Sequence, residues 1–146
     1  IINGFNKNKP ELQIYFGEID DSIFNSFVNK HLELACRKTK TDQCWNLIKE
    51  MIIERKAILL ESNNNYILYF ISNSYCYYAI NACTKNDKIA TFLLYEGIKW
   101  LIYNNYKFIH FGQFYKYYDD EKNINISKFK YSFCNKIYTQ YYLEKK

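Results

Sequence analysis

The feature that most constrains the fold is a run of three apolar segments separated by asparagine-rich breaks. The segments are 56–62, 66–72 and 75–81, and the breaks read NNN and NS. Asparagine tolerates positive φ, so two tight β-hairpins are predicted. Both faces of the second and third segments are apolar or aromatic, which indicates central strands covered on both sides by helices. The middle of the chain therefore predicts an antiparallel meander inside an α/β domain.

Two amphipathic helices are predicted before the meander, preceded by a short strand at 12–17. Asp20 or Asp21 opens the first helix, which ends near Ala35, and Thr41 or Asp42 caps the second. The apolar stripe of the first helix comprises Ile23, Phe24, Phe27, Val28, Leu32 and Leu34. The inner face of the second, 42–54, comprises Cys44, Trp45, Ile48, Met51 and Ile52.

The segment after the meander predicts a helix, a strand, a second helix and a last strand. A long helix begins at residue 89, and its Leu93, Trp100 and Leu101 are expected to face the sheet. Gly97 is costly in mid-helix unless another backbone packs closely there. The later elements are expected at 106–112, 121–133 and 135–143. A meander followed by a β-α-β crossover predicts a mixed sheet with helices on both faces.

Composition sets the broad class of the protein. A chain of 146 residues with 49% hydrophobic residues and one proline predicts a single folded domain, 1–146. The first residue is Ile1, so we expect a C-terminal piece of a longer protein. The net charge of +5 accompanies a chain rich in Asn, Ile, Lys and Tyr, so it is weak support for a nucleic-acid partner.

The cysteines and the apolar middle exclude further classes. The five cysteines form no CxxC pair and lie in apolar stretches, which indicates buried free thiols in a reducing compartment such as the cytoplasm. The two histidines are far apart, so no metal site is expected. Residues 62–84 carry no charge, but asparagines divide them into runs too short to span a membrane.

Four motifs, in this order and spacing, resemble the FemAB-like acyltransferases of the GNAT superfamily. They read ACRKTKTDQCW at 35–45, KAILL at 56–60, FIHFGQ at 108–113 and DEKNINISKFKYSF at 120–133. The first resembles an A-x-R-x-T loop before a Trp-bearing helix, and the last resembles a D-K-E-x-x-I-x-x-FK-x-x-F signature. The resemblance implies a GNAT-like fold, with a mixed, mostly antiparallel central sheet and helices on both faces.

The segment before residue 89 departs from ordinary acetyltransferases. Those enzymes have an R/Q-x-x-G-x-G/A pyrophosphate loop there, whereas this chain reads CTKNDKIATF without glycine. Close approach of a backbone to a pyrophosphate usually needs glycine, so the sequence disfavours ordinary use of acetyl-CoA. FemAB-like proteins share the loss, and many of them take the acyl group from aminoacyl-tRNA. After the last helix the family usually has Gly-Gly, and this chain has Cys134-Asn135.

The resemblance implies a bacterial acyltransferase of cell-envelope biogenesis. It would transfer an acyl or aminoacyl group to an amine of a nucleotide-linked sugar or envelope precursor, with no tightly bound cofactor. The donor would be aminoacyl-tRNA or an acyl-CoA. One alternative is an acetyl-CoA-dependent N-acetyltransferase of a sugar or small amine. Another is a non-catalytic GNAT-like half that packs on a second GNAT-like domain.

The helix at 121–133 carries the leading catalytic candidate, Lys130. Ile126, Phe129 and Phe133 line one side of that helix, and Lys130 lies at its edge. The resemblance implies that the Phe129-Lys130 pair lies at the substrate site, where the ammonium would stabilise the oxyanion of acyl transfer. The alternatives are that Lys130 extends to water and that Phe129 belongs to the core.

Lys122 begins the same helix, where a cation is unfavourable unless it meets an anion. It either binds a substrate phosphate or pairs at the surface with Asp119 or Glu121.

The remaining candidates lie in two other segments. Arg37 and Thr39 belong to a basic loop with Lys38 and Lys40, where Arg37 would grip a phosphate; the alternative is a solvated loop. His110 lies near the end of a predicted strand, where GNAT-type sites occur, and is a candidate general base. It could equally be a buried histidine bonded to a neighbour. Gln113 and Tyr115 are candidates for binding the substrate.

Overall fold

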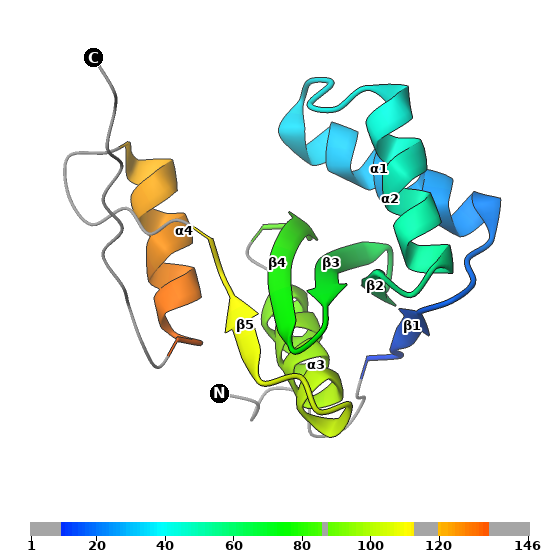
Figure 1. Cartoon of the computed structure of the whole chain (residues 1–146). Helices are drawn as coiled ribbons and strands as arrows, with labels where there is room; N and C mark the ends of the chain where they lie inside the picture. Colours follow the sequence, from blue (N-terminus) through cyan, green and yellow to red (C-terminus); the bar gives the residue numbers. More distant parts are fainter. Residues whose placement is uncertain (1–9, 86–87, 113–119, 135–146) are drawn as a thin grey trace, which may run out of the picture. The chain divides into compact units, whose positions relative to one another are not determined.

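A computed structural model describes residues 10–85, 88–112 and 120–134. The chain divides into two compact units, Ile1–His110 and Phe111–Lys146, and each is described by itself (Figure 1). The first unit contains β1 (Gln13–Tyr15), α1 (Asp21–Ala35), α2 (Asp42–Ile53), β2 (Ala57–Ser62), β3 (Asn65–Ser72), β4 (Tyr75–Ala82), α3 (Ile89–Tyr103) and β5 (Phe108–His110). The second unit contains α4 (Glu121–Tyr131).

The five strands form one sheet in the order β1-β2-β3-β4-β5. Neighbouring strands are antiparallel except for β4 and β5, which are parallel. The hairpin turns contain Asn63 (φ 48°), Asn64 (φ 58°) and Asn73 (φ 47°), in the left-handed region that asparagine tolerates. These observations confirm the predicted meander and the mixed, mostly antiparallel sheet. The strand predicted at 135–143 lies outside the described residues.

Helices cover both faces of the sheet, as predicted. Helices α1 and α2 pack on one face, and α3 packs against β2 and β3 on the other (Figure 1). The core of the first face comprises Phe24, Phe27, Trp45, Ile48, Ile52, Ala57, Leu59, Tyr66, Leu68, Ile80 and Ala82. Burial of this many large apolar side chains is the main source of stability for the unit.

The α3 face is closed by a contact between Gly97 and Tyr69. A Cβ added at Gly97 would lie 2.7 Å from the Tyr69 ring, and the Tyr69 hydroxyl donates a hydrogen bond to the Leu94 carbonyl at 3.3 Å. The close approach at Gly97 is therefore made by a side-chain ring and not by another backbone. The missing side chain instead admits a buried aromatic ring between helix and sheet.

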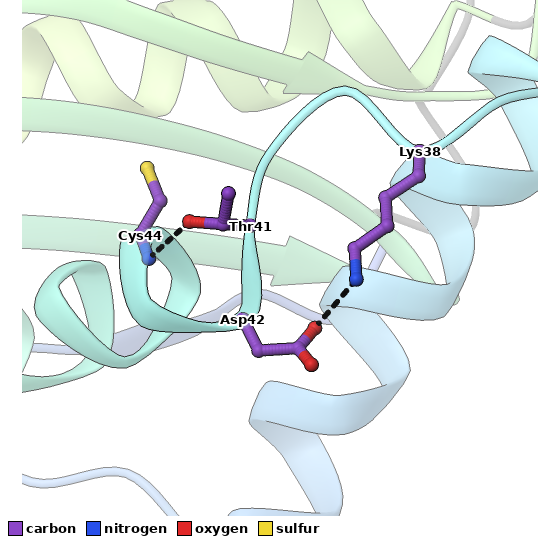
Figure 2. A network of polar contacts seen from close by, with 4 residues as sticks. All are labelled: Lys38, Thr41, Asp42 and Cys44. Carbon is purple, nitrogen blue, oxygen red and sulfur yellow. Dashed lines mark hydrogen bonds and ion pairs between the residues drawn. The ribbon is translucent and has the colours of Figure 1, made fainter.

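The start of α2 is fixed by a side-chain cap. The hydroxyl of Thr41 accepts a hydrogen bond from the Cys44 N–H at 3.1 Å, and Lys38 forms an ion pair with Asp42 at 3.1 Å (Figure 2). This confirms Thr41 as the N-cap residue. By contrast, Asp20 precedes α1 without a side-chain cap bond.

Several predicted positions differ in the structure. Leu34 and Cys36 are exposed, because they lie at the end of α1 beyond the core cluster. Trp100 is half-buried, and its ring packs against Phe16 and Tyr106 rather than into the centre of the sheet. No helix in the described residues is long and apolar enough to cross a membrane.

Candidate active site

The strands β4 and β5 are paired along only part of β4. Their register runs from Tyr75 opposite Phe108 to Tyr77 opposite His110. Strand β4 then continues to Ala82, and no strand in the described residues pairs with this stretch on the β5 side. An unpaired strand edge presents N–H and C=O groups that can bind an extended, amide-bearing ligand. The opening between β4 and β5 is therefore the first component of the candidate site.

A β-bulge lies in β4 beside this opening. Leu68 pairs with Ile80 and Tyr69 pairs with Tyr78, so Ala79 is the extra residue without a partner in β3. Bulges bend a strand and are over-represented next to active sites. Here the bulge falls within two residues of Tyr77, where β4 parts from β5.

Aromatic side chains are exposed on the paired part of β4 and β5. Tyr75 stacks on Phe108, with centroids 5.1 Å apart, and Tyr77 stacks on His110 at 5.7 Å. Tyr75, Tyr77 and Phe108 are 58%, 44% and 55% exposed. The prediction that both faces of β4 are covered is therefore wrong at its first half, because the core against α1 and α2 reaches only the second half.

His110 is the last residue of β5, and its ring is exposed at the opening. It is therefore not a buried histidine, which was the alternative to a general base. The role of general base stays a prediction. The candidates Gln113 and Tyr115 lie outside the described residues.

The loop that follows β4 is held by side chains of the chain itself. The Asn81 side-chain oxygen accepts the Cys83 N–H at 3.1 Å, and the Asn65 side-chain oxygen accepts the Thr84 N–H at 2.8 Å. From α1, the Lys30 ammonium donates to the Thr84 hydroxyl at 2.9 Å. Two of the amides that lead toward the N-terminus of α3 are therefore already hydrogen-bonded.

The basic loop between α1 and α2 is anchored by His31. Its Nε2 lies 2.7 Å from the Thr39 hydroxyl, and its ring meets the Trp45 ring at 5.3 Å. The ammonium of Lys40 lies over the same Trp45 ring, 5.3 Å from its centroid. Burial lowers the pKa of His31, and the charge of Lys40 lowers it further. The predicted ligand-binding residue Thr39 thus also fixes the loop.

Arg37 differs from the two lysines of this loop in having no partner among the described residues. Lys38 is paired with Asp42, and Lys40 lies on Trp45, whereas Arg37 is exposed and makes no hydrogen bond or ion pair within the described part of the chain. Its guanidinium can therefore bind an anion without first breaking an internal contact.

The loop between α1 and α2 and the loop after β4 lie at the same end of the sheet. Lys30 of α1 reaches the loop after β4, and its neighbour His31 holds Thr39 of the loop between α1 and α2. Trp45 also packs edge-on against Phe27, which contacts Tyr66 at the start of β3. This end therefore combines Lys30 of α1 with the cations of the loop between α1 and α2, beside the C-terminal half of β4.

Helix α4 carries the last group of candidates in the second unit. Asp120 caps it by accepting the Asn123 N–H at 2.8 Å, and Lys122 is exposed. Phe129 and Phe133 form an edge-to-face pair with centroids 5.4 Å apart. Ile126, which the sequence analysis placed on the same side of the helix, is 40% exposed.

Lys130 lies on the more buried side of α4. It is half-buried, and Ser127 one turn earlier is buried. Burial lowers the pKa of Lys130, while the nearby Cys134 opposes this shift. Burial likewise raises the pKa of Cys134, against the effect of Lys130. Burial thus favours the uncharged form of each group, and Lys130 does not simply extend into water.

Metal ligands do not gather in the described residues, where no group of three His, Cys, Asp or Glu side chains is placed to hold an ion. The catalytic and binding roles predicted for Lys130, His110, Arg37, Thr39, Lys122 and Phe129 remain predictions. What the structure adds is the opening in the sheet and the residues that hold its loops.

The fold is that of GNAT acetyltransferases. The chain is similar to the aminoglycoside acetyltransferase meta-AAC0020 from an uncultured soil metagenomic sample, in complex with sisomicin. The TM-score is 0.65 at 10% identity, over 93% of this chain and 96% of that chain. It is also similar to a probable acetyltransferase, with a TM-score of 0.62 at 12% identity, over 93% of this chain and 98% of that chain. No protein-family model and no curated protein matches the sequence.

Four residues of the candidate site were missed in the sequence. Lys30 and His31 look like ordinary residues of an amphipathic helix, and only the tertiary contacts show that they reach two different loops. Asn81 before a loop is a recognisable Asx-turn signal, but its amide partner was not predicted. Asn65 was interpreted only as a turn residue, and its bond to Thr84 spans 19 positions of sequence.

Proposed function

We propose that this chain transfers an acyl group to an amine at the opening between β4 and β5. The observation that carries the proposal is the end of β4–β5 pairing at Tyr77 and His110, beside a bulge at Ala79, in a GNAT fold. The stretch of β4 from Ala79 to Ala82 would pair with the amide groups of the donor's arm, as an added strand does. That pairing would hold the acyl carbonyl near His110.

The chemistry follows from His110 at the opening and from the role that the FemAB-like resemblance implies for Lys130 of the second unit. The acceptor amine attacks the acyl carbonyl carbon, and the new C–N bond forms as the bond to the donor's sulfur or oxygen breaks. His110 accepts the proton released by the amine, and the leaving group later takes up a proton. Lys130 is proposed to stabilise the oxyanion that develops on the carbonyl oxygen.

The acceptor is proposed to carry an anionic group. Arg37 is exposed and uncommitted in the loop between α1 and α2, and Thr39 is held beside it by His31. A guanidinium in this position suits a phosphate. The amine of a nucleotide-linked sugar or phosphorylated envelope precursor fits this loop better than a polycationic aminoglycoside such as sisomicin, which the similar structure holds.

Acyl-CoA is the first candidate donor. The similar structures are acetyltransferases, and the chain matches 96% and 98% of the lengths of two of them. Aminoacyl-tRNA, the FemAB-like donor, is the second candidate. It is favoured by the lack of glycine after β4 and by the internal hydrogen bonds of the Cys83 and Thr84 amides.

Calorimetric titration followed by a transfer assay tests the proposal. We expect acetyl-CoA to bind with micromolar affinity and acetyl transfer to a uridine-diphosphate-linked amino sugar but not to sisomicin. Absence of acetyl-CoA binding, together with transfer from an aminoacyl-tRNA, would select the second donor. Absence of transfer from either donor to any amine would contradict the proposed activity and favour a non-catalytic half that packs on another domain.

A further inference from the structure

Helix α3 is apolar on two sides. Its buried side packs against β2 and β3. The side turned away from the sheet carries a second row of residues, which we call the outer stripe and which is formed by Thr91, Tyr95, Ile98 and Ile102. These four positions fall within an arc of about 60° around the helix axis. A helix with apolar residues on both sides is typical of a helix that is buried on both sides.

The outer stripe is accessible in the single chain. Ile102 is 64% exposed and Tyr95 is 39% exposed, while Thr91 and Ile98 are half-buried. Single exposed apolar residues are normal on a protein surface, but a continuous row of them marks an interaction surface. The steps along the stripe are four, three and four residues, which is the spacing at which one helix packs along another.

The outer stripe reads the same in both directions along the helix. Consider a second copy of α3 that runs antiparallel about a two-fold axis midway between Tyr95 and Ile98. Its own stripe would then lie in register, with Tyr95 of each copy against Ile98 of the other. Thr91 would lie against Ile102 in the same way. Such self-complementarity is what a two-fold interface between identical chains requires.

The charges of α3 fit the same arrangement. Glu96 and Lys99 are the charged residues of this helix, and they form an ion pair at 2.6 Å on one flank of the outer stripe. The Lys99 ammonium also lies over the Tyr95 ring, 4.9 Å from its centroid, and so at the edge of the stripe.

The two possible directions of the second helix treat this charged flank differently. An antiparallel pair sets the flank against the same flank of the second copy, so that Lys99 of each copy lies near Glu96 of the other. A parallel pair sets it against the opposite flank of the helix, which carries no charge. Charge complementarity therefore favours the antiparallel pair.

We propose that two copies of this chain associate through the outer stripe, as an antiparallel pair of α3 helices. The association removes the apolar side chains of both stripes from water, and each α3 becomes buried on both sides. This inference goes beyond the proposed acyl transfer and does not depend on it, because no residue of the outer stripe belongs to the candidate active site.

Sedimentation equilibrium of the full chain tests the association. We expect a monomer–dimer equilibrium in the micromolar range for the wild type. Ile102→Glu should weaken the dimer by at least about a hundredfold, because an unpaired carboxylate would be buried at the interface. Ile102 is largely exposed in the single chain, so the variant should fold, and thermal unfolding checks this.

Leu47→Glu is the matched control for this substitution. Leu47 is an exposed apolar residue of α2 outside the outer stripe, at 54% exposure, so its substitution should leave the dimer unchanged. A wild-type chain that stays monomeric at millimolar concentration would overturn the proposal and leave the stripe to a different partner. A dimer that a folded Ile102→Glu chain still forms equally well would overturn it too.

Disulfide cross-linking tests the direction of the two helices. Thr91→Cys and Ile102→Cys chains are oxidised separately and as a mixture, each in a chain whose exposed Cys36 is replaced by serine. In the antiparallel pair like positions lie about 16 Å apart along the axis, beyond the reach of a disulfide. We therefore expect a cross-linked dimer from the mixture and not from either chain alone. Cross-links within each separate chain, or none in a dimeric mixture, would contradict the antiparallel pair.

Discussion

The two faces of the sheet differ in how completely they are covered. On the α3 face, Tyr69 is fully buried against Gly97, and its hydroxyl is bonded to Leu94. On the other face, the core under α1 and α2 ends near Ala79, and Tyr75, Tyr77 and His110 are exposed. The closed face stabilises the unit, while the open one provides edges and rings that can meet a ligand. Substitutions in the closed face should therefore change stability, and those at polar candidate positions should change rate.

The largest expected effect on rate comes from Lys130. Lys130→Ala should lower turnover by about a hundredfold or more without unfolding the chain, since loss of one oxyanion-stabilising group has that magnitude. Rates and thermal unfolding are measured in parallel. Lys128→Ala, at an exposed position of the same helix, is the control. Equal rates for the two variants would remove Lys130 from the mechanism.

The pH dependence sharpens this test. Because burial lowers the pKa of Lys130, the ammonium is lost at a lower pH than is usual for lysine. If activity depends on the charge of Lys130, it should therefore fall as the pH rises through this lowered pKa. Lys130→Arg should move that fall to higher pH, because a guanidinium keeps its charge.

The largest effect on stability is expected at Gly97. Gly97→Ala places a Cβ 2.7 Å from the Tyr69 ring, so it should lower the free energy of unfolding by about 1–3 kcal/mol, as overpacking does. Urea denaturation measures the change. In a chain that already carries Tyr69→Val, Gly97→Ala should lower the free energy of unfolding by much less, because the aromatic ring is no longer there. Equal costs in both backgrounds would show that the ring contact is not the cause.

A smaller effect on acceptor binding is expected at Arg37. Arg37→Ala should raise KM for an anionic acceptor by about tenfold with little change in kcat, since a charge-assisted hydrogen bond is worth about this much. The KM of Arg37→Lys should lie between those of the wild type and Arg37→Ala, because lysine binds phosphate without the bidentate geometry. Lys38→Ala is the matched control, since Lys38 is already paired with Asp42. A larger effect at Lys38 would reverse the assignment within this loop.

The smallest expected effect is the pH dependence set by His31. Its folded-state pKa is lowered, so the unfolded chain binds the proton more readily, and stability should fall as pH drops below about 6.5. The loss develops between the unfolded and folded pKa values and then levels off. The contribution of His31 to this loss of stability is measured by comparing the urea midpoints of the wild type and of His31→Gln over the same range of pH. A wild-type slope that persists in His31→Gln would assign the effect to other groups.

Prediction from the sequence succeeded where local chemistry decides the outcome. The asparagines of the hairpin turns take the left-handed conformation expected, and Thr41 caps α2 as predicted. It was less accurate where burial depends on distant elements. Tyr77 looked like a core residue because its segment is apolar on both faces, but it is 44% exposed and lies outside the core under α1 and α2.

The candidate site shows the same division. Arg37, Thr39, His110 and Lys130 were proposed from motifs, which preserve residue type and spacing, and their roles stay predictions. The residues that hold the loops, Lys30, His31, Asn65 and Asn81, carry no such signal.

The sequence by itself determined the order of the elements, the meander with its asparagine turns and the mixed sheet with two helical layers. These follow from hydrophobic periodicity and turn chemistry, which act over a few residues. Only the tertiary structure decided where β4 parts from β5, which ring Gly97 admits and which amides of the β4–α3 loop are occupied. Each of these joins residues far apart in the chain, and a contact between distant segments exists only once the packed core has brought them together.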